Sequence, residues 1–299
     1  HVLVDSIRGA TKQLYSSDST EEQTEAQGLT GFASDGFTLG THAYFNGNSK
    51  TYVAWGWKAG TTGSGTTTGS GTGKAYSYSV STAAGFSIVQ YLGNGTAAHT
   101  IPHHLGAVPK MIMVKKNADA EWQVYHASIG NGNVLHLDTN SAPEDVTNRW
   151  NDTTPTSSVF AIGTSGNVNA NDVRYIAYCF AEKQGYSKFG SYIGNGNADG
   201  TFVYLGFKPA LIIIKNSAGT DNWWIIDNKR SPFNQVERAL LPNEPDAEST
   251  SDVDLDITAQ GFKVLSSSGR TNASGNKYIY MAFAENPFVT STGIPATAR

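Results

Sequence analysis

The stretch YIAYCFAE at residues 175–182 has a near copy, YIYMAFAE, at residues 278–285. Both stretches are rich in aromatic side chains, which favour strands. The two copies start 278 − 175 = 103 residues apart, and a copy at such a separation indicates a repeated structural unit. We therefore expect a fold built from repeats of this length.

Three further segments recur in the same order along the chain. The segments at residues 110–115 and 210–215 are continuous apolar runs, which are typical of strands covered on both faces. The copies are YLGNG and YIGNG (91–95 and 192–196), VPKMIMVK and KPALIIIK (108–115 and 208–215), and WQVYH and WWIID (122–126 and 223–227).

These landmarks predict an all-β fold of tandem antiparallel β-sandwich modules of about 100 residues, with complete modules at residues 85–186 and 187–288. No helical pattern is long enough for the crossovers of a parallel sheet. Asn-Gly pairs, which suit two-residue hairpin turns, occur at Asn46, Asn94, Asn131 and Asn195. The residues expected in equivalent places are Met111 and Leu211, Trp122 and Trp223, and Tyr175 and Tyr278.

Residues 1–57 match only the second half of this pattern. Uncovered strand edges and apolar faces are costly, so three or four partner strands should come from an upstream segment, another chain or the flanking module. The matches are HVLVD (1–5) with 122–126 and 223–227, GFTL (36–39) with GFKV (261–264), and YVAW (52–55) with the strands at 175 and 278.

Two segments have no counterpart in the repeat. Residues 58–84 include a tract of Gly, Ser and Thr without an apolar anchor, and this composition predicts a flexible linker. Residues 289–299 are expected to be a C-terminal tail.

Charge and composition narrow the classes of function. The net charge is −4 and Lys and Arg are not clustered, which argues against a nucleic-acid partner. No apolar stretch approaches the ~20 residues of a membrane helix, so membrane insertion is not expected. The single cysteine, Cys179, lies in an apolar run and is expected to be a buried thiol. No cofactor is expected.

Four phrases carry a family resemblance, namely DSIRGATK (5–12), SDGFTLG (34–40), YVAWGWKAG (52–60) and AFAENPF (282–288). They resemble repeat modules near the C-terminus of structural proteins of aquatic bacteriophages, described as tail-fibre or virion surface proteins. The resemblance implies a place on the virion surface, with other virion proteins and further copies of the chain as partners. It also implies that a lectin-like or SPRY-like sandwich precedes the modules.

Flat aromatic side chains are the candidates for binding a host glycan. Trp223 and Trp224 are adjacent, so alternation along a strand should place them on opposite faces. Trp122 and Trp223 occupy equivalent repeat positions and are expected in the core. Trp224 is therefore the better candidate for a sugar platform, followed by Trp150.

Two groups of residues could hold a metal ion. Asp252, Asp254 and Asp256 alternate along an expected edge strand, and clustered carboxylates suit calcium, although a solvated loop followed by an edge strand that charges protect explains the same residues. His99, His103 and His104 have a spacing that could hold a metal ion such as zinc, but the other repeat has the plain strand residues Val203 and Tyr204 opposite His103 and His104.

The sequence predicts a structural protein and not an enzyme. It contains no Gly-x-Ser-x-Gly elbow, no phosphate-binding loop and no His-Glu-x-x-His helix. The expected role is that of a bacteriophage tail-fibre or surface-appendage component that contacts a host glycan. The alternatives are a capsid fibre or decoration protein, and a lectin-like glycan-binding module outside a virion.

Overall fold

The structure is a computed structural model that describes residues 1–250 and 253–287. Its strands form antiparallel sheets, and the helices of the described part are two four-residue turns, α1 (Ala43–Asn46) and α2 (Gly166–Asn169). The predicted all-β fold class is confirmed. None of the described helices has the length and apolar character needed to cross a membrane.

Residues 61–186, the central module, form two facing sheets. The larger sheet has the order β12-β11-β16-β9-β8-β6, the smaller one the order β15-β10-β7, and β13 pairs with β14. The strands are β6 (Thr61–Thr66), β7 (Thr68–Gly69), β8 (Ala75–Ser81), β9 (Phe86–Leu92), β10 (His99–Pro102), β11 (Pro109–Lys116), β12 (Gln123–His126), β13 (Asn133–Val134), β14 (Glu144–Asp145), β15 (Val159–Ile162) and β16 (Arg174–Ala181).

Residues 187–287, the C-terminal module, repeat this plan. A five-stranded sheet of order β17-β24-β19-β20-β21 faces a three-stranded sheet of order β18-β23-β22. The strands are β17 (Ser187–Ile193), β18 (Phe202–Tyr204), β19 (Pro209–Asn216), β20 (Trp223–Asp227), β21 (Ala239–Leu240), β22 (Leu255–Thr258), β23 (Gly261–Val264) and β24 (Lys277–Ala284).

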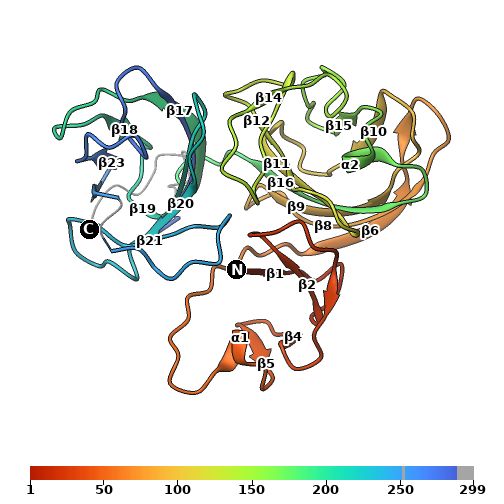
Figure 1. Cartoon of the computed structure of the whole chain (residues 1–299). Helices are drawn as coiled ribbons and strands as arrows, with labels where there is room; N and C mark the ends of the chain where they lie inside the picture. Colours follow the sequence, from red (N-terminus) through yellow and green to blue (C-terminus); the bar gives the residue numbers. More distant parts are fainter. Residues whose placement is uncertain (251–252, 288–299) are drawn as a thin grey trace.

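Residues 1–57, the N-terminal segment, form a three-stranded sheet β1-β2-β3 and a separate β4–β5 hairpin. Figure 1 shows the two complete modules side by side, with β1 and β2 beside their junction and the β4–β5 hairpin and α1 farther out. The strands are β1 (Val2–Val4), β2 (Lys12–Tyr15), β3 (Gln23–Thr24), β4 (Leu29–Phe32) and β5 (Phe37–Leu39).

The two complete modules share strand register as well as strand order. In both, the ladder between the two long central strands is interrupted just after a proline, Pro109 in β11 and Pro209 in β19. Beyond this bulge Met111 lies opposite Phe180, and Leu211 lies opposite Phe283. Proline has no N–H to donate to a ladder, so a bulge at the strand start tolerates it. Met111 and Leu211 therefore occupy equivalent places, as predicted.

The Asn-Gly pairs perform a different task from the hairpin turns that the sequence predicted. Gly95 has φ +73° and Gly196 has φ +67°, but each N–H reaches across the module to a backbone carbonyl, that of Asn169 or Asn272. Gly47 has φ −68°, an ordinary value. The repeated YxGNG sequence therefore fastens the end of a long strand to a distant turn and does not close a hairpin.

The long strands are buried on both faces, as their continuous apolar runs predicted. Within β11, Ile112 and Val114 lie in the core of the central module, whereas Met111 faces a second cluster, which we call the shared core. Within β24, Tyr278 points into the core of its own module and Met281 into the shared core. The shared core thus joins the outer faces of both modules, and the buried residue Leu14 brings the N-terminal segment into it.

The predicted linker at residues 58–84 is wrong. Residues 61–66 form β6, which pairs with β8 along its whole length at one edge of the six-stranded sheet. A Cβ atom added at Gly63 would lie only 2.6 Å from Oη of Tyr78. A tyrosine from the neighbouring strand packs against β6 at this point, so the glycine leaves room for its ring.

The strand expected at Tyr52–Trp55 is absent, since residues 51–60 are assigned to no strand. In the C-terminal module the matching strand, β24, lies between β17 and β19 and pairs with both. The N-terminal segment contains no counterpart of either neighbour. An extended segment without ladder partners cannot be a sheet strand, although its side chains Trp55 and Trp57 still pack against the shared core.

Three aromatic rings from the three parts of the chain meet in the shared core. The ring centroid of Trp57 lies 6.1 Å from that of Phe180 and 5.4 Å from that of Phe283, and the last two are 6.2 Å apart. The sequence alignment places these residues at equivalent repeat positions, two residues after Trp55, Tyr178 and Met281. The N-terminal segment and both modules are therefore arranged around a common centre with approximate threefold character.

We expect Phe180→Ala to lower the free energy of unfolding by about 3–5 kcal/mol, because it removes a buried ring that contacts all parts of this centre. Phe233→Ala is the matched control, since Phe233 is 81% exposed and its loss should change stability by less than about 0.5 kcal/mol. Equilibrium unfolding in urea measures both. Two separate transitions, of which only one responds to Phe180→Ala, would contradict a shared core.

Candidate functional site

Neither tryptophan predicted as a sugar platform reaches the surface. Trp224 is 2% exposed in the core of the C-terminal module, and Trp150 is 1% exposed in the core of the central module. The prediction assumed that one face of β20 is open. Both faces are covered, because Trp223 points into the shared core and Trp224 into the core of its own module. A buried indole cannot stack on a sugar, so this prediction is wrong.

Of the three carboxylates predicted to bind calcium, Asp252 lies outside the described residues. Asp254 precedes β22, and Asp256 lies opposite Lys263 in the β22–β23 ladder. Among residues 1–250 and 253–287, no three His, Cys, Asp or Glu side chains come together as a metal site would require. The calcium site stays a prediction.

The histidines considered as metal ligands have separate hydrogen-bond partners. His99 lies between Thr67 Oγ1 at 2.7 Å and Asn94 Nδ2 at 2.8 Å. His103 Nε2 lies 3.1 Å from the carbonyl of Thr156. Burial lowers the pKa of His103 to about 4, so its neutral form is favoured.

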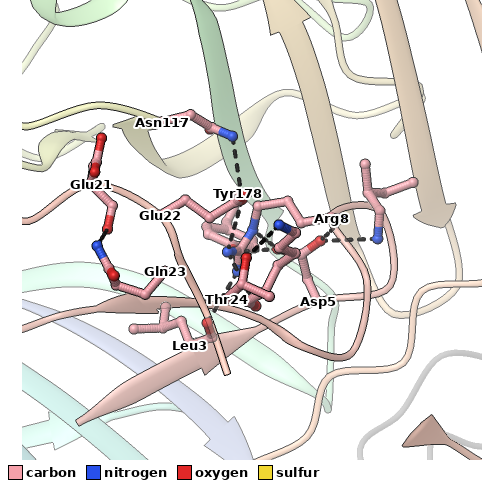
Figure 2. A network of polar contacts seen from close by, with 11 residues as sticks. Leu3, Asp5, Arg8, Glu21, Glu22, Gln23, Thr24, Asn117 and Tyr178 are labelled. Carbon is pink, nitrogen blue, oxygen red and sulfur yellow. Dashed lines mark hydrogen bonds and ion pairs between the residues drawn. The ribbon is translucent and has the colours of Figure 1, made fainter. Parts of the chain in front are cut away.

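The most elaborate polar site lies where the N-terminal segment meets the central module (Figure 2). Asp5 Oδ1 accepts hydrogen bonds from the backbone N–H groups of Ile7 and Arg8, and Oδ2 accepts one from Arg8 Nε at 2.5 Å. The Tyr178 hydroxyl of β16 donates to the same Oδ2 at 2.7 Å. Burial raises the pKa of Tyr178 well above its usual value, which keeps this phenol protonated and able to donate.

The remaining donors of Arg8 are directed at the same junction. Its Nη2 donates to the carbonyl of Leu3 at 3.0 Å, and Nη1 lies 3.4 Å from a carboxylate oxygen of Glu22. Asn117 of the central module donates to that same oxygen at 3.2 Å. The side chains of Arg8 and Asp5 are 0% and 4% exposed. The junction therefore contains a buried ion pair whose hydrogen bonds fix it to two parts of the chain.

The same arrangement recurs at the equivalent place in the C-terminal module. Asp227 accepts from the N–H groups of Lys229 and Arg230 and from Arg230 Nε at 2.7 Å. Arg230 also pairs with Glu248 at 3.1 Å. Its guanidinium lies over the ring of Trp55, 5.9 Å from the centroid, and Trp55 is the sequence counterpart of Tyr178. In both cases the Asp-Arg pair contacts a different unit of the chain, the central module through Tyr178 and the N-terminal segment through Trp55.

In the central module a histidine replaces this aspartate. His126 Nδ1 accepts the N–H of Ser128, and Nε2 lies 3.2 Å from the carbonyl of Tyr280 in β24. Burial lowers the pKa of His126 to about 4, so a neutral ring with its proton on Nε2 fits these contacts. The three contacts form a closed cycle that runs from the N-terminal segment to the central module, then to the C-terminal module and back.

Two tryptophans make equivalent hydrogen bonds across the junctions. Trp122 Nε1 donates to the carbonyl of Tyr15 at 2.8 Å, and Trp223 Nε1 donates to the carbonyl of His136 at 2.8 Å. Each donor is on the first residue of the repeated WQVYH or WWIID segment, and each acceptor is in the preceding part of the chain. These tryptophans are core residues, as predicted, and they also join neighbouring units.

Buried lysines add a third contact of the same kind. Lys115 Nζ donates to the carbonyl of Ser19 at 2.9 Å, and Lys215 Nζ donates to the carbonyl of Asn140 at 3.1 Å. Both lysines are 0% exposed, and burial lowers the pKa of each to about 8. The sequence signal was present, because both lysines end the repeated runs at residues 110–115 and 210–215, but no role was predicted for them.

One family model spans all of these junctions. A domain of unknown function, DUF7483, matches residues 1–287. The chain belongs to this family. No curated protein and no solved structure matches it. The DUF7483 match includes the N-terminal segment together with both modules, in agreement with the core that they share.

In the described part of the DUF7483 chain, an open hollow with aromatic side chains in its lining lies at the edge of the central module. Its volume is about 660 Å³, and its walls include Lys58, Tyr78 and His104. The rings of Tyr78 and His104 stack with centroids 3.7 Å apart, and Tyr76 Oη lies 3.0 Å from His104 Nε2. The sequence offered a signal that was missed, namely the alternation of Tyr and Ser at residues 76–79.

We expect Arg8→Met to destabilise the DUF7483 chain by about 3–5 kcal/mol, because it leaves the buried Asp5 carboxylate without its counterion. Arg238→Met is the matched control. Arg238 also pairs with a carboxylate, that of Glu248, but its side chain is 50% exposed, so its loss should cost less than about 1 kcal/mol. Thermal and urea unfolding give both values. Equal effects of the two substitutions would show that the buried Asp5–Arg8 pair contributes no more to the free energy of unfolding than an exposed ion pair.

Proposed function

We propose that this chain is a rigid, non-catalytic structural unit of a bacteriophage virion, displayed on the surface as part of a tail fibre or related appendage. The observation that carries the proposal is the set of buried junctions, in which an Asp-Arg pair, a tryptophan N–H and a lysine are used to hold successive units together. Such contacts suit a component that must keep its shape under mechanical load.

The virion location rests on the resemblance of the quoted phrases to phage surface proteins. One of those phrases, DSIRGATK at residues 5–12, contains Asp5 and Arg8, so it coincides with the junction in Figure 2. The structure supplies a physical role for the motif, which is the fixing of one unit to the next. Other virion proteins and further copies of the chain are the proposed partners.

Electron microscopy of purified phage particles that encode this chain tests the proposal. Gold-labelled antibodies against the folded chain should bind a fibre or appendage, and mass spectrometry of the particles should find the chain at a fixed copy number. Label on the capsid shell would favour the alternative of a capsid fibre or decoration protein. A particle preparation without the chain would rule out both.

A second candidate function is glycan binding, and the hollow beside Tyr76, Tyr78 and His104 favours it. Stacked rings beside polar groups are a surface on which sugar rings can pack. The test is binding to an array of bacterial surface glycans, compared between the wild-type chain and Tyr78→Ala, with Tyr44→Ala as a control because Tyr44 is exposed elsewhere. Binding that persists unchanged in Tyr78→Ala would exclude this hollow as the site.

A further inference from the structure

The outer part of the N-terminal segment carries an exposed apolar face. Phe32 and Phe37, which lie opposite each other in the β4–β5 hairpin, are 48% and 46% exposed, and Tyr52 is 50% exposed. Their grouping on one hairpin and the adjoining segment requires an explanation.

Each of these residues has a counterpart in the C-terminal module that is buried. Phe37 corresponds to Phe262, since both follow the glycine of the repeated Gly-Phe motif, and Phe262 is 0% exposed. The partner of Phe262 across the β22–β23 ladder is Ile257, which is 7% exposed, as Phe32 is the partner of Phe37.

The correspondence of Tyr52 with Tyr278 extends to individual hydrogen bonds. The Tyr52 hydroxyl donates to the carbonyl of Ala43 and accepts the N–H of Gly47. The Tyr278 hydroxyl donates to the carbonyl of Gly269 and accepts the N–H of Ala273, and Tyr278 is 0% exposed. The N-terminal segment has therefore formed the same local structure and lacks only what covers it.

The C-terminal module shows what the cover is. The ring of Tyr192 in β17 stacks on Tyr278 with centroids 5.1 Å apart and meets the edge of Phe262 at 6.0 Å. Val203 of β18 lies opposite Phe262 in the ladder. These strands, together with β19, lie within residues 187–216, which is the first half of the module.

The N-terminal segment also has an asparagine that matches the one hydrogen-bonded to the cover in the C-terminal module. Asn272 donates to the carbonyl of Ser266 and accepts the N–H of Asn195 through Oδ1 at 3.0 Å. Asn46 donates to the carbonyl of Gly40 in the same way. The central module has the same pair, since Asn169 accepts the N–H of Asn94 at 2.8 Å.

We propose that the face formed by Phe32, Phe37 and Tyr52 is a docking site for the first half of another module of this repeat, a three-stranded segment with the YxGNG pattern. The segment would add one strand beside β5 and one strand on each side of residues 51–58. It would place its tyrosine on Tyr52 and its asparagine N–H on Asn46.

Other occupants fit the face less well. A small molecule could cover the rings but could not pair with backbone along two edges. A second copy of the chain would have to withdraw its own residues 187–216 from a packed module and would expose as much apolar surface as it covered. A first half-module that does not belong to a complete module has no packed partner to leave, so its docking exposes no buried apolar surface. This inference goes beyond the proposed function and does not depend on a virion location.

The test is to duplicate residues 187–222 directly before His1 in the full chain. This junction is in register, because residue 222 precedes Trp223 and His1 is the counterpart of Trp223. Amide hydrogen exchange over residues 29–54 should slow by at least about tenfold in the extended chain. An extension of equal length with Tyr192→Ser in the duplicated copy is the matched control and should protect much less.

A second measurement covers the case in which the extended chain does not fold. A synthetic peptide of residues 187–222 is added to the unmodified chain, and binding is followed by fluorescence anisotropy. Phe37→Asp should abolish this binding, whereas Phe233→Asp, at an exposed position outside the face, should leave it unchanged. Absence of protection in a folded extended chain, or a peptide that binds Phe37→Asp as well as wild type or does not bind at all, would overturn the proposal.

Discussion

Burial of the central strands on both faces is the constraint on which the rest of the structure depends. A strand such as β16 places Tyr175 and Cys179 in one core and Phe180 in another, so a single sandwich cannot bury both of its faces. The second face needs an apolar neighbour, and the outer faces of the other units supply it. The modules are consequently parts of one packed body, and this explains why residues 175–181 and 278–284 form continuous apolar runs.

Apolar packing alone would let such faces slide, because the hydrophobic effect has no direction. The polar contacts at the junctions fix the orientation of each unit relative to its neighbour. The Asp5–Arg8 pair and its copy at Asp227–Arg230 hold a turn rigid and present it to the neighbouring unit. The indole N–H groups of Trp122 and Trp223 then fix the register between units, since each buried donor needs an acceptor and finds it in a carbonyl of the neighbouring unit.

The sequence predicted the strands and their equivalence well, because strand periodicity and repeat spacing are local signals. It failed where a residue's role is set by a distant neighbour. Trp224 was placed at the surface by alternation, which holds only for a strand with one open face. Gly63 suggested a linker, although its small size makes room for Tyr78. The junction formed by Asp5 and Tyr178 could not be foreseen, because 173 residues separate its partners.

The contacts between units also limit how many can assemble. They run in one direction, from the N-terminal segment to the central module, onward to the C-terminal module, and back through Arg230 to Trp55. Head-to-tail contacts of this kind either continue without limit or close upon themselves, depending on the rotation between neighbours. Here the rotation closes after three units, and Trp57, Phe180 and Phe283 occupy the axis. A fourth unit would find every position around that axis taken, so a longer array of this repeat would have to be counted in triplets.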